Sequence, residues 1–114
     1  MFDFKKLNVY QKAKVFANDC NVLISNNEFD RHINDQLKRA SFSIMLNIAE
    51  GSSRFENKDS KNFLVIARGS AFECSAIFDF LYDNRAISGK EFQDFENKLE
   101  EISKMLFALI KSLE

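Results

Sequence analysis

The C-terminal part of the chain carries a regular apolar repeat that constrains the fold more than any other feature. Large apolar residues recur at alternating spacings of three and four, namely Phe92, Phe95, Leu99, Ile102, Leu106, Leu109 and Leu113. This spacing places them along one side of an α-helix, as in the seam of a coiled coil. Ser88 and Glu91 have the spacing of a capping box, so the helix is predicted over about 89–113. Its apolar side needs other helices to cover it.

The rest of the chain predicts three more helices joined by short connections. Apolar residues recur at helical spacing over about 6–25, 33–52 and 59–84. The chain contains no Pro and only three Gly, which favours long helices over a β-rich fold. Asn57 or Asp59 is expected to cap the third helix. We therefore predict an all-α fold, an up-down-up-down four-helix bundle that forms a single domain over residues 1–114.

Two aromatic residues precede the first predicted helix. Phe2 and Phe4 either fold back onto the bundle as an anchor or dock on a neighbouring subunit, and the sequence leaves both possibilities open.

A polar stripe runs along the second predicted helix, in the segment RASFSIMLNIAEGSSR. Its members, spaced three or four residues apart, are Arg39, Ser43, Asn47, Glu50 and Arg54. Apolar residues flank the stripe on both sides, so we expect this helix to be mostly buried and its polar groups to have partners. Glu50 lies in the last turn, where the helix dipole disfavours a carboxylate, so its expected partner is Arg39 or Arg54, or the equivalent Arg of another subunit. Glu73 is a candidate to complete the network.

The middle of the third predicted helix is made of small residues. Ala67, Gly69, Ser70 and Ala71 follow one another closely, and the Gly alone costs about 1 kcal/mol of helix propensity. We interpret this stretch as a close crossing with another helix. The second and third helices also carry more apolar residues than one internal seam requires, which predicts a homo-oligomer.

The two central segments resemble a known family. QLKRASFSIMLNIAEGSSR (residues 36–54) and FLVIARGSAFE (residues 63–73) are similar to the small proteins encoded in intervening sequences of bacterial 23S ribosomal RNA genes. That family includes the accessory variability protein of diversity-generating retroelements. The resemblance implies a four-helix bundle, assembly into a homopentameric ring and no enzymatic activity. The motif residues that match are Arg39, Ser43, Asn47, Glu50, Gly51, Gly69, Ser70 and Glu73, which we interpret as a buried network that specifies one packing or one oligomer.

Two classes of partner fit this resemblance and the charge pattern. Residues 31–68 carry seven basic and four acidic groups, a net +3, within a chain of net charge −1. The retroelement member binds nucleic acid and a reverse transcriptase, so the first hypothesis is RNA or other nucleic acid. Its candidate contacts are Lys38, Arg39, Arg54, Lys58, Lys61 and Arg68. The alternative is a scaffold that binds a protein partner in helix grooves of the ring.

Catalytic and metal-binding patterns are missing from the sequence. His32 directly follows Arg31, so the Arg-x4-6-His pair of helical RNases of the HEPN class is absent. Cys20 and Cys74 stand 54 residues apart with one His in the chain, which does not make a zinc site. We expect no enzymatic activity, metal or cofactor. The N-terminus lacks the apolar run of a signal peptide, and no stretch approaches the roughly 18 apolar residues of a membrane span, which predicts a soluble, cytoplasmic protein.

Overall fold

The computed structural model describes residues 2–114, so Met1 of the expected domain lies outside the described residues. A short 3-10 helix, η1, spans Asp3–Lys6. The four α-helices are α1 (Asn8–Ser25), α2 (Arg31–Ser52), α3 (Asn57–Asp83) and α4 (Gly89–Ser112). The predicted all-α fold and the four helices are confirmed.

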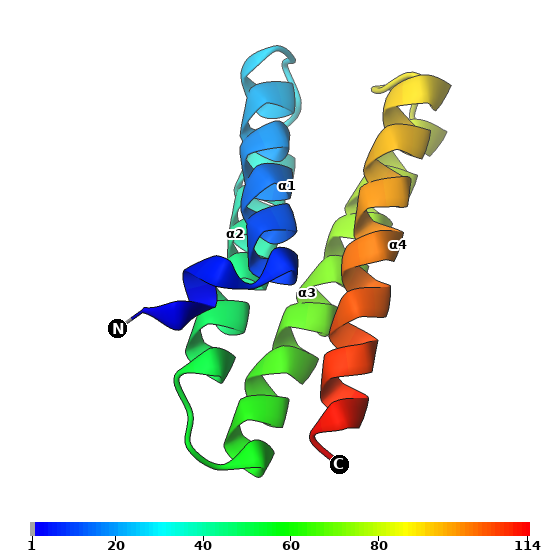
Figure 1. The fold of residues 1–114 in the computed structure, drawn as a ribbon. Coiled ribbons are helices and arrows are strands. Elements are labelled where there is room, and N and C mark those ends of the chain that lie inside the picture. The colour runs from blue at the N-terminus through cyan, green and yellow to red at the C-terminus, as the bar shows by residue number, and fades with distance from the viewer. Residues whose placement is uncertain (1) are drawn as a thin grey trace.

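The helices form an elongated antiparallel bundle with up-down-up-down order (Figure 1). Each helix packs against its neighbours along the chain, and α4 also packs against α1, so every helix contacts two others. The contact between α2 and α3 is the most extensive. The molecule measures 44 × 24 × 21 Å along its principal axes. Among residues 2–114, none of the helices is both long and apolar enough to cross a bilayer.

The predicted apolar seams lie in the core. Val9, Ala13, Phe16, Cys20 and Leu23 of α1 are all buried, as are Leu37, Ala40, Ile44 and Ile48 of α2. In α4 the buried residues include Phe95, Leu99, Ile102 and Leu106. Helices α1, α3 and α4 meet in an aromatic cluster, where the Phe78 ring stacks on Phe95 at 4.4 Å and Phe16 meets both rings edge-on.

The helix ends differ in detail from the prediction. The capping box of α4 is present, because the Glu91 backbone N–H donates to Ser88 Oγ at 3.1 Å and the Ser88 backbone N–H donates to Glu91 Oε1 at 2.9 Å. The N-cap of α3 is Glu56, so the expectation of Asn57 or Asp59 was wrong. Glu56 already has an extended backbone, and its side chain makes no capping hydrogen bond. Helix α3 therefore begins without a side-chain cap.

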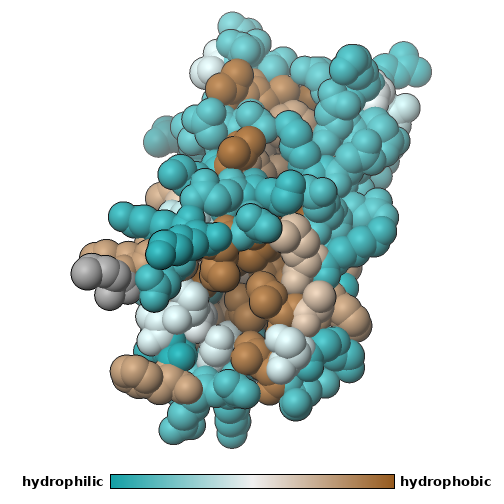
Figure 2. Space-filling view, in the orientation of Figure 1, coloured by the Kyte–Doolittle hydropathy of each residue, from teal (hydrophilic) through white to brown (hydrophobic). Residues whose placement is uncertain are grey.

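Helix α1 is shorter than its neighbours and covers only part of the bundle (Figure 1). The chain before it turns aside as η1, which contacts α1 and α2. Phe4 is half-buried and packs edge-on against Tyr10 at 4.8 Å, so Phe4 folds back onto its own bundle, whereas Phe2 is exposed. Figure 2 shows apolar side chains at the surface of the lower half of this side, beyond the start of α1.

Candidate interaction surface

The polar stripe of α2 contacts α3 through serine hydroxyls. Ser43 Oγ and Ser70 Oγ lie 2.8 Å apart in a hydrogen bond between the two helices. Asn47 Nδ2 donates to the Ser43 carbonyl at 2.9 Å and to Ser43 Oγ at 3.0 Å. Ser70 is buried and the other two residues are half-buried. These three motif residues therefore form part of the polar network that was expected, at the contact between α2 and α3.

Glu50 pairs with Arg54 at the C-terminal end of α2. Arg54 Nη2 donates to Glu50 Oε2 at 2.9 Å, and the Arg54 guanidinium also lies 4.5 Å from the ring centre of Phe63 on α3. Arg54 is thus the partner that Glu50 needs to offset the helix dipole. Both side chains are about half exposed, so this pair contributes little to stability.

The close approach between the two central helices occurs at Gly51. A Cβ at this position would lie 3.1 Å from the Ser60 carbonyl oxygen and 3.3 Å from Phe63 Cβ. Only a residue without a side chain lets the end of α2 approach the start of α3 this closely. Gly51 thus provides a close approach at the end of α2, in addition to the small residues Ala67, Ser70 and Ala71 of α3, which are buried.

Gly69 has a different environment from the one expected. A Cβ built on it meets no atom within 4 Å among the described residues, so Gly69 makes no close helix crossing within residues 2–114. The reason is helical register. Ser70 faces α2, and Gly69, about 100° around the helix, faces outward.

Arg39 and Glu73 also point away from the buried network. Both residues are exposed, and neither forms an ion pair within residues 2–114. The expectation that Glu73 completes a buried network was therefore wrong within one subunit. Of the motif residues, Ser43, Asn47, Gly51 and Ser70 lie at the contact between α2 and α3. Arg39, Gly69 and Glu73 are exposed on the surface of the bundle.

Large apolar side chains surround these displayed motif residues. The exposed large apolar side chains of α2 and α3 include Phe42, Leu46, Val65, Ile66 and Phe80. We call this surface, together with Arg39, Gly69 and Glu73, the outer α2/α3 face. A surface with this many exposed aliphatic and aromatic side chains is typical of a site of association.

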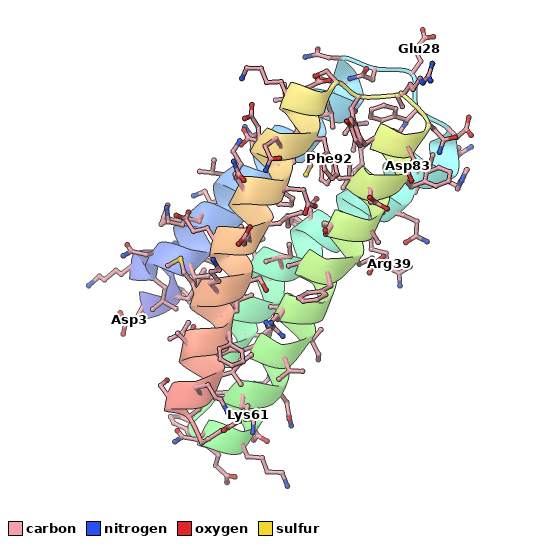
Figure 3. The ribbon with its side chains drawn as sticks, turned by 90° about the vertical axis from the view of Figure 1, so that its right-hand side faces the viewer. Asp3, Glu28, Arg39, Lys61, Asp83 and Phe92 are labelled. Atoms are coloured by element: carbon pink, nitrogen blue, oxygen red, sulfur yellow. The ribbon has the colours of Figure 1, made fainter. Side chains whose placement is uncertain are left out.

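The basic residues proposed to bind nucleic acid do not form one patch. Lys61 pairs with Glu114 at 3.2 Å, and Figure 3 shows Lys61 near one end of the bundle, far from Arg39. Arg54 pairs with Glu50, and Arg68 lies between two aromatic rings in a cleft. Lys38 and Lys58 are exposed and form no ion pair within the described part of the chain. The structure thus separates residues that are close in sequence.

The cleft that contains Arg68 was not predicted from the sequence. It lies between α3 and α4, with Phe72, Ser75, Glu96 and Ser103 among the residues that line it. The spacing of Arg68 and Phe72, four residues apart on a helix, is the one sequence signal that indicates their contact.

The two cysteines are free and buried in the core. Burial, and then the neighbouring Cys74, raises the pKa of the Cys20 thiol far above its usual range. Burial likewise raises the pKa of the Cys74 thiol to about 12. Both thiols are therefore protonated at neutral pH and poor nucleophiles. Residues 2–114 contain no group of three or more His, Cys, Asp or Glu side chains arranged to hold a metal ion.

Comparison with known proteins places the chain in a family. No curated protein matches it. A crystal structure of a protein of unknown function from the S23 ribosomal protein family of Bacteroides thetaiotaomicron VPI-5482 matches with a TM-score of 0.82 and 28% sequence identity. The match covers 90% of this chain and 95% of that one. The family of 23S rRNA-intervening sequence proteins matches residues 5–108. This chain therefore belongs to the 23S rRNA-intervening sequence protein family.

Proposed function

We propose that this protein is a non-enzymatic scaffold whose subunits assemble through the outer α2/α3 face into a homo-oligomeric ring, which we infer to be a pentamer. The observation that carries the proposal is the exposed apolar surface around Gly69, which nothing within residues 2–114 covers. Burying apolar area contributes roughly 25 cal/mol per Å², so self-association would remove an unfavourable surface from water.

Gly69 gives this face a shape suited to a protein neighbour. Its open surface lets a second copy approach the α3 backbone, as small residues do where helices pack closely. Arg39 and Glu73 supply one charge of each sign beside the apolar residues, and both are available for pairing across the contact. If the face meets a different surface of the neighbouring copy, the contact is heterologous and closes into a ring when the rotation allows it.

Light scattering on the purified protein tests the assembly. We expect a mass several times that of the subunit at micromolar concentration. Ile66→Glu introduces a charge on the outer α2/α3 face and should shift the protein toward the subunit mass. Val22→Glu on α1 is the matched control, since Ile66 is 51% exposed and Val22 is 50% exposed. A monomeric wild-type protein, or equal masses for both variants and the wild type, would contradict the proposal.

RNA or other nucleic acid is the second candidate partner, supported by the net +3 of residues 31–68. Lys38 and Lys58, which form no ion pair within residues 2–114, are the best placed to contact phosphate. In a ring their charges repeat around the symmetry axis and reinforce one another.

Salt dependence tests this second candidate. Binding to a labelled structured RNA should weaken strongly between about 50 and 200 mM salt. The double variant Lys38→Glu, Lys58→Glu should lose binding. The charge-matched control Lys6→Glu, Lys14→Glu should keep it. Equal binding by both double variants would argue against a site on the central segment.

We also propose that the protein is cytoplasmic. Its two cysteines are unpaired and buried, as is usual for proteins of a reducing compartment. Fractionation of the native host cells, with an antibody against this chain, tests the compartment.

A further inference from the structure

A cleft lies between α3 and α4, and all its lining residues come from these two helices. Its volume is about 310 Å³, and its lining mixes apolar and charged side chains. Leu99 and Ala71 form part of its floor, since both are buried core residues. The cleft does not include Arg39, Gly69 or Glu73, so it is distinct from the outer α2/α3 face.

Arg68 is held in this cleft by two aromatic rings. Its guanidinium carbon lies 5.0 Å from the ring centre of Phe72 and 5.3 Å from that of Phe107. Aromatic rings attract a guanidinium at this distance, and such contacts fix its position without using its N–H donors. The side chain is therefore preorganised, with its hydrogen-bonding edge available to a ligand.

One of these donors has no acceptor. Arg68 Nε is buried, and no atom of the described residues accepts a hydrogen bond from it. A buried donor without an acceptor costs free energy. The planar fork of a guanidinium matches the two oxygens of a carboxylate, with which it forms paired, charge-assisted hydrogen bonds.

The carboxylates already in the cleft have other partners. Glu100 pairs with Lys104 at 3.0 Å, and Glu96 accepts a hydrogen bond from Ser75 Oγ at 2.6 Å. Two acidic and two basic residues line the cleft, so its formal charge is balanced. This balance disfavours a polyanion such as an RNA backbone, because each added phosphate meets Glu96 or Glu100. A single carboxylate, by contrast, can bind the Arg68 edge alone.

We propose that this cleft binds a protein partner through an Asp or Glu side chain flanked by apolar residues. The carboxylate binds the guanidinium of Arg68, and the flanking residues pack on Phe72 and Phe107. Both rings are about half exposed, at 58% and 48%, so they offer apolar area on either side of the cation. Ser103 also lines the cleft and provides a hydroxyl donor. The inference extends the proposed scaffold function, on which it rests for its biological role, by naming the partner's chemistry.

Two labelled peptides test the proposal with the full-length protein. The first is an acetylated peptide of sequence KALFELAK, and the second has Gln in place of its Glu. We expect saturable binding of the Glu peptide, measured by fluorescence anisotropy, at least about tenfold tighter than that of the Gln peptide. Arg68→Gln should reduce the affinity for the Glu peptide to that for the Gln peptide. Arg85→Gln, which removes the same charge outside the cleft, should leave binding unchanged.

A conservative variant separates binding from a structural role of Arg68. Arg68→Lys keeps the charge and the long stem but loses the planar fork, so it should weaken Glu-peptide binding less than Arg68→Gln does. Circular dichroism establishes that each variant is folded. Equal affinity for the two peptides, or unchanged binding by Arg68→Gln, would overturn the proposal. So would binding of a structured RNA that depends on Arg68 when neither peptide binds, because the cleft would then be a phosphate site.

Light scattering of the same samples keeps this proposal separate from self-association. A monomeric protein that binds the Glu peptide through Arg68 supports the cleft and contradicts the ring. An oligomer that binds neither peptide overturns the cleft and leaves the ring intact.

Discussion

The hydroxyl of Ser43 on α2 and that of Ser70 on α3 are hydrogen-bonded at 2.8 Å, within the most extensive helix contact of the bundle. Asn47 donates to the same Ser43 hydroxyl at 3.0 Å, so one oxygen joins two neighbouring groups. The bond lies at the edge of the core and needs a specific register between α2 and α3, because hydrogen bonds require good distance and angle.

This hydrogen bond predicts a measurable coupling between the two serines. In a double-mutant cycle of Ser43→Ala and Ser70→Ala, we expect a coupling free energy of about 0.5–1.5 kcal/mol, the net contribution of one intramolecular hydrogen bond. Urea unfolding followed by circular dichroism provides the four stabilities. Strictly additive single effects would mean that the two hydroxyls do not interact in solution. Ser112→Ala, at the exposed end of α4, is a suitable control, and its effect should add to that of Ser70→Ala.

The sequence predicted the buried side of each helix well, because burial leaves a periodic signal. The α4 seam illustrates this, since Leu99, Ile102 and Leu106 are all buried as the spacing predicts. In α3 the fully buried residues include Ala67, Cys74 and Phe78. Helix α3 contacts both α2 and α4, so its buried surface is wider than one seam.

The environment of small and polar residues was harder to predict. Gly69 and Gly51 both suggest close packing, yet only Gly51 has a close neighbour, because the direction of a residue depends on the packing of its helix. Arg68 was grouped with other basic residues by sequence proximity. Its guanidinium also contacts the ring of Phe107, which is 39 positions later and reaches Arg68 only through the packing of α4 on α3.

The end of α3 provides a second stability prediction. Arg85 has a φ of 59°, and the bonds from Arg85 N to Tyr82 O at 3.0 Å and from Ala86 N to Leu81 O at 2.9 Å form a Schellman motif. A residue with a Cβ is strained in this left-handed conformation, and Gly is not. Arg85→Gly should therefore stabilise the protein by about 0.5–1 kcal/mol, measured by urea unfolding. Arg85→Ala keeps the Cβ and should give no such gain; equal gains for both would show that loss of the charge is the cause.

The buried cysteines predict a loss of stability at alkaline pH. Their folded-state pKa values are raised above the ordinary 9.0, for Cys74 to about 12, so the folded state holds protons that the unfolded state releases. The stabilisation is complete below pH 9 and decreases as pH rises from about 9 toward 12, by up to about 1.4 kcal/mol per pH unit for each thiol.

Comparison with a cysteine-free variant isolates this effect. Cys20→Ala with Cys74→Ala removes both thiols, so the free energy of unfolding should decrease less steeply above pH 9 than in the wild type. Tyr and Lys residues titrate in both proteins, and their contribution cancels in the difference. Parallel stability curves would show that the thiols are not the groups responsible. Both cysteines should also react slowly with a thiol reagent at neutral pH unless urea is added.

The two glycines of the family motif predict opposite effects of the same substitution. Gly51→Ala places a methyl group 3.1 Å from the Ser60 carbonyl oxygen, a backbone atom that cannot move without shifting α3. We expect a loss of about 1–3 kcal/mol in the free energy of unfolding, as for other overpacked sites. Gly69→Ala meets no atom of residues 2–114 within 4 Å, so it should stabilise the helix of the isolated subunit by roughly 0.5–1 kcal/mol. If a neighbouring copy packs on Gly69, the added methyl group should also weaken self-association, which light scattering over a dilution series measures. Stabilisation of the subunit together with weaker association would locate the contact between copies at Gly69, whereas unchanged association would place that contact elsewhere on the bundle.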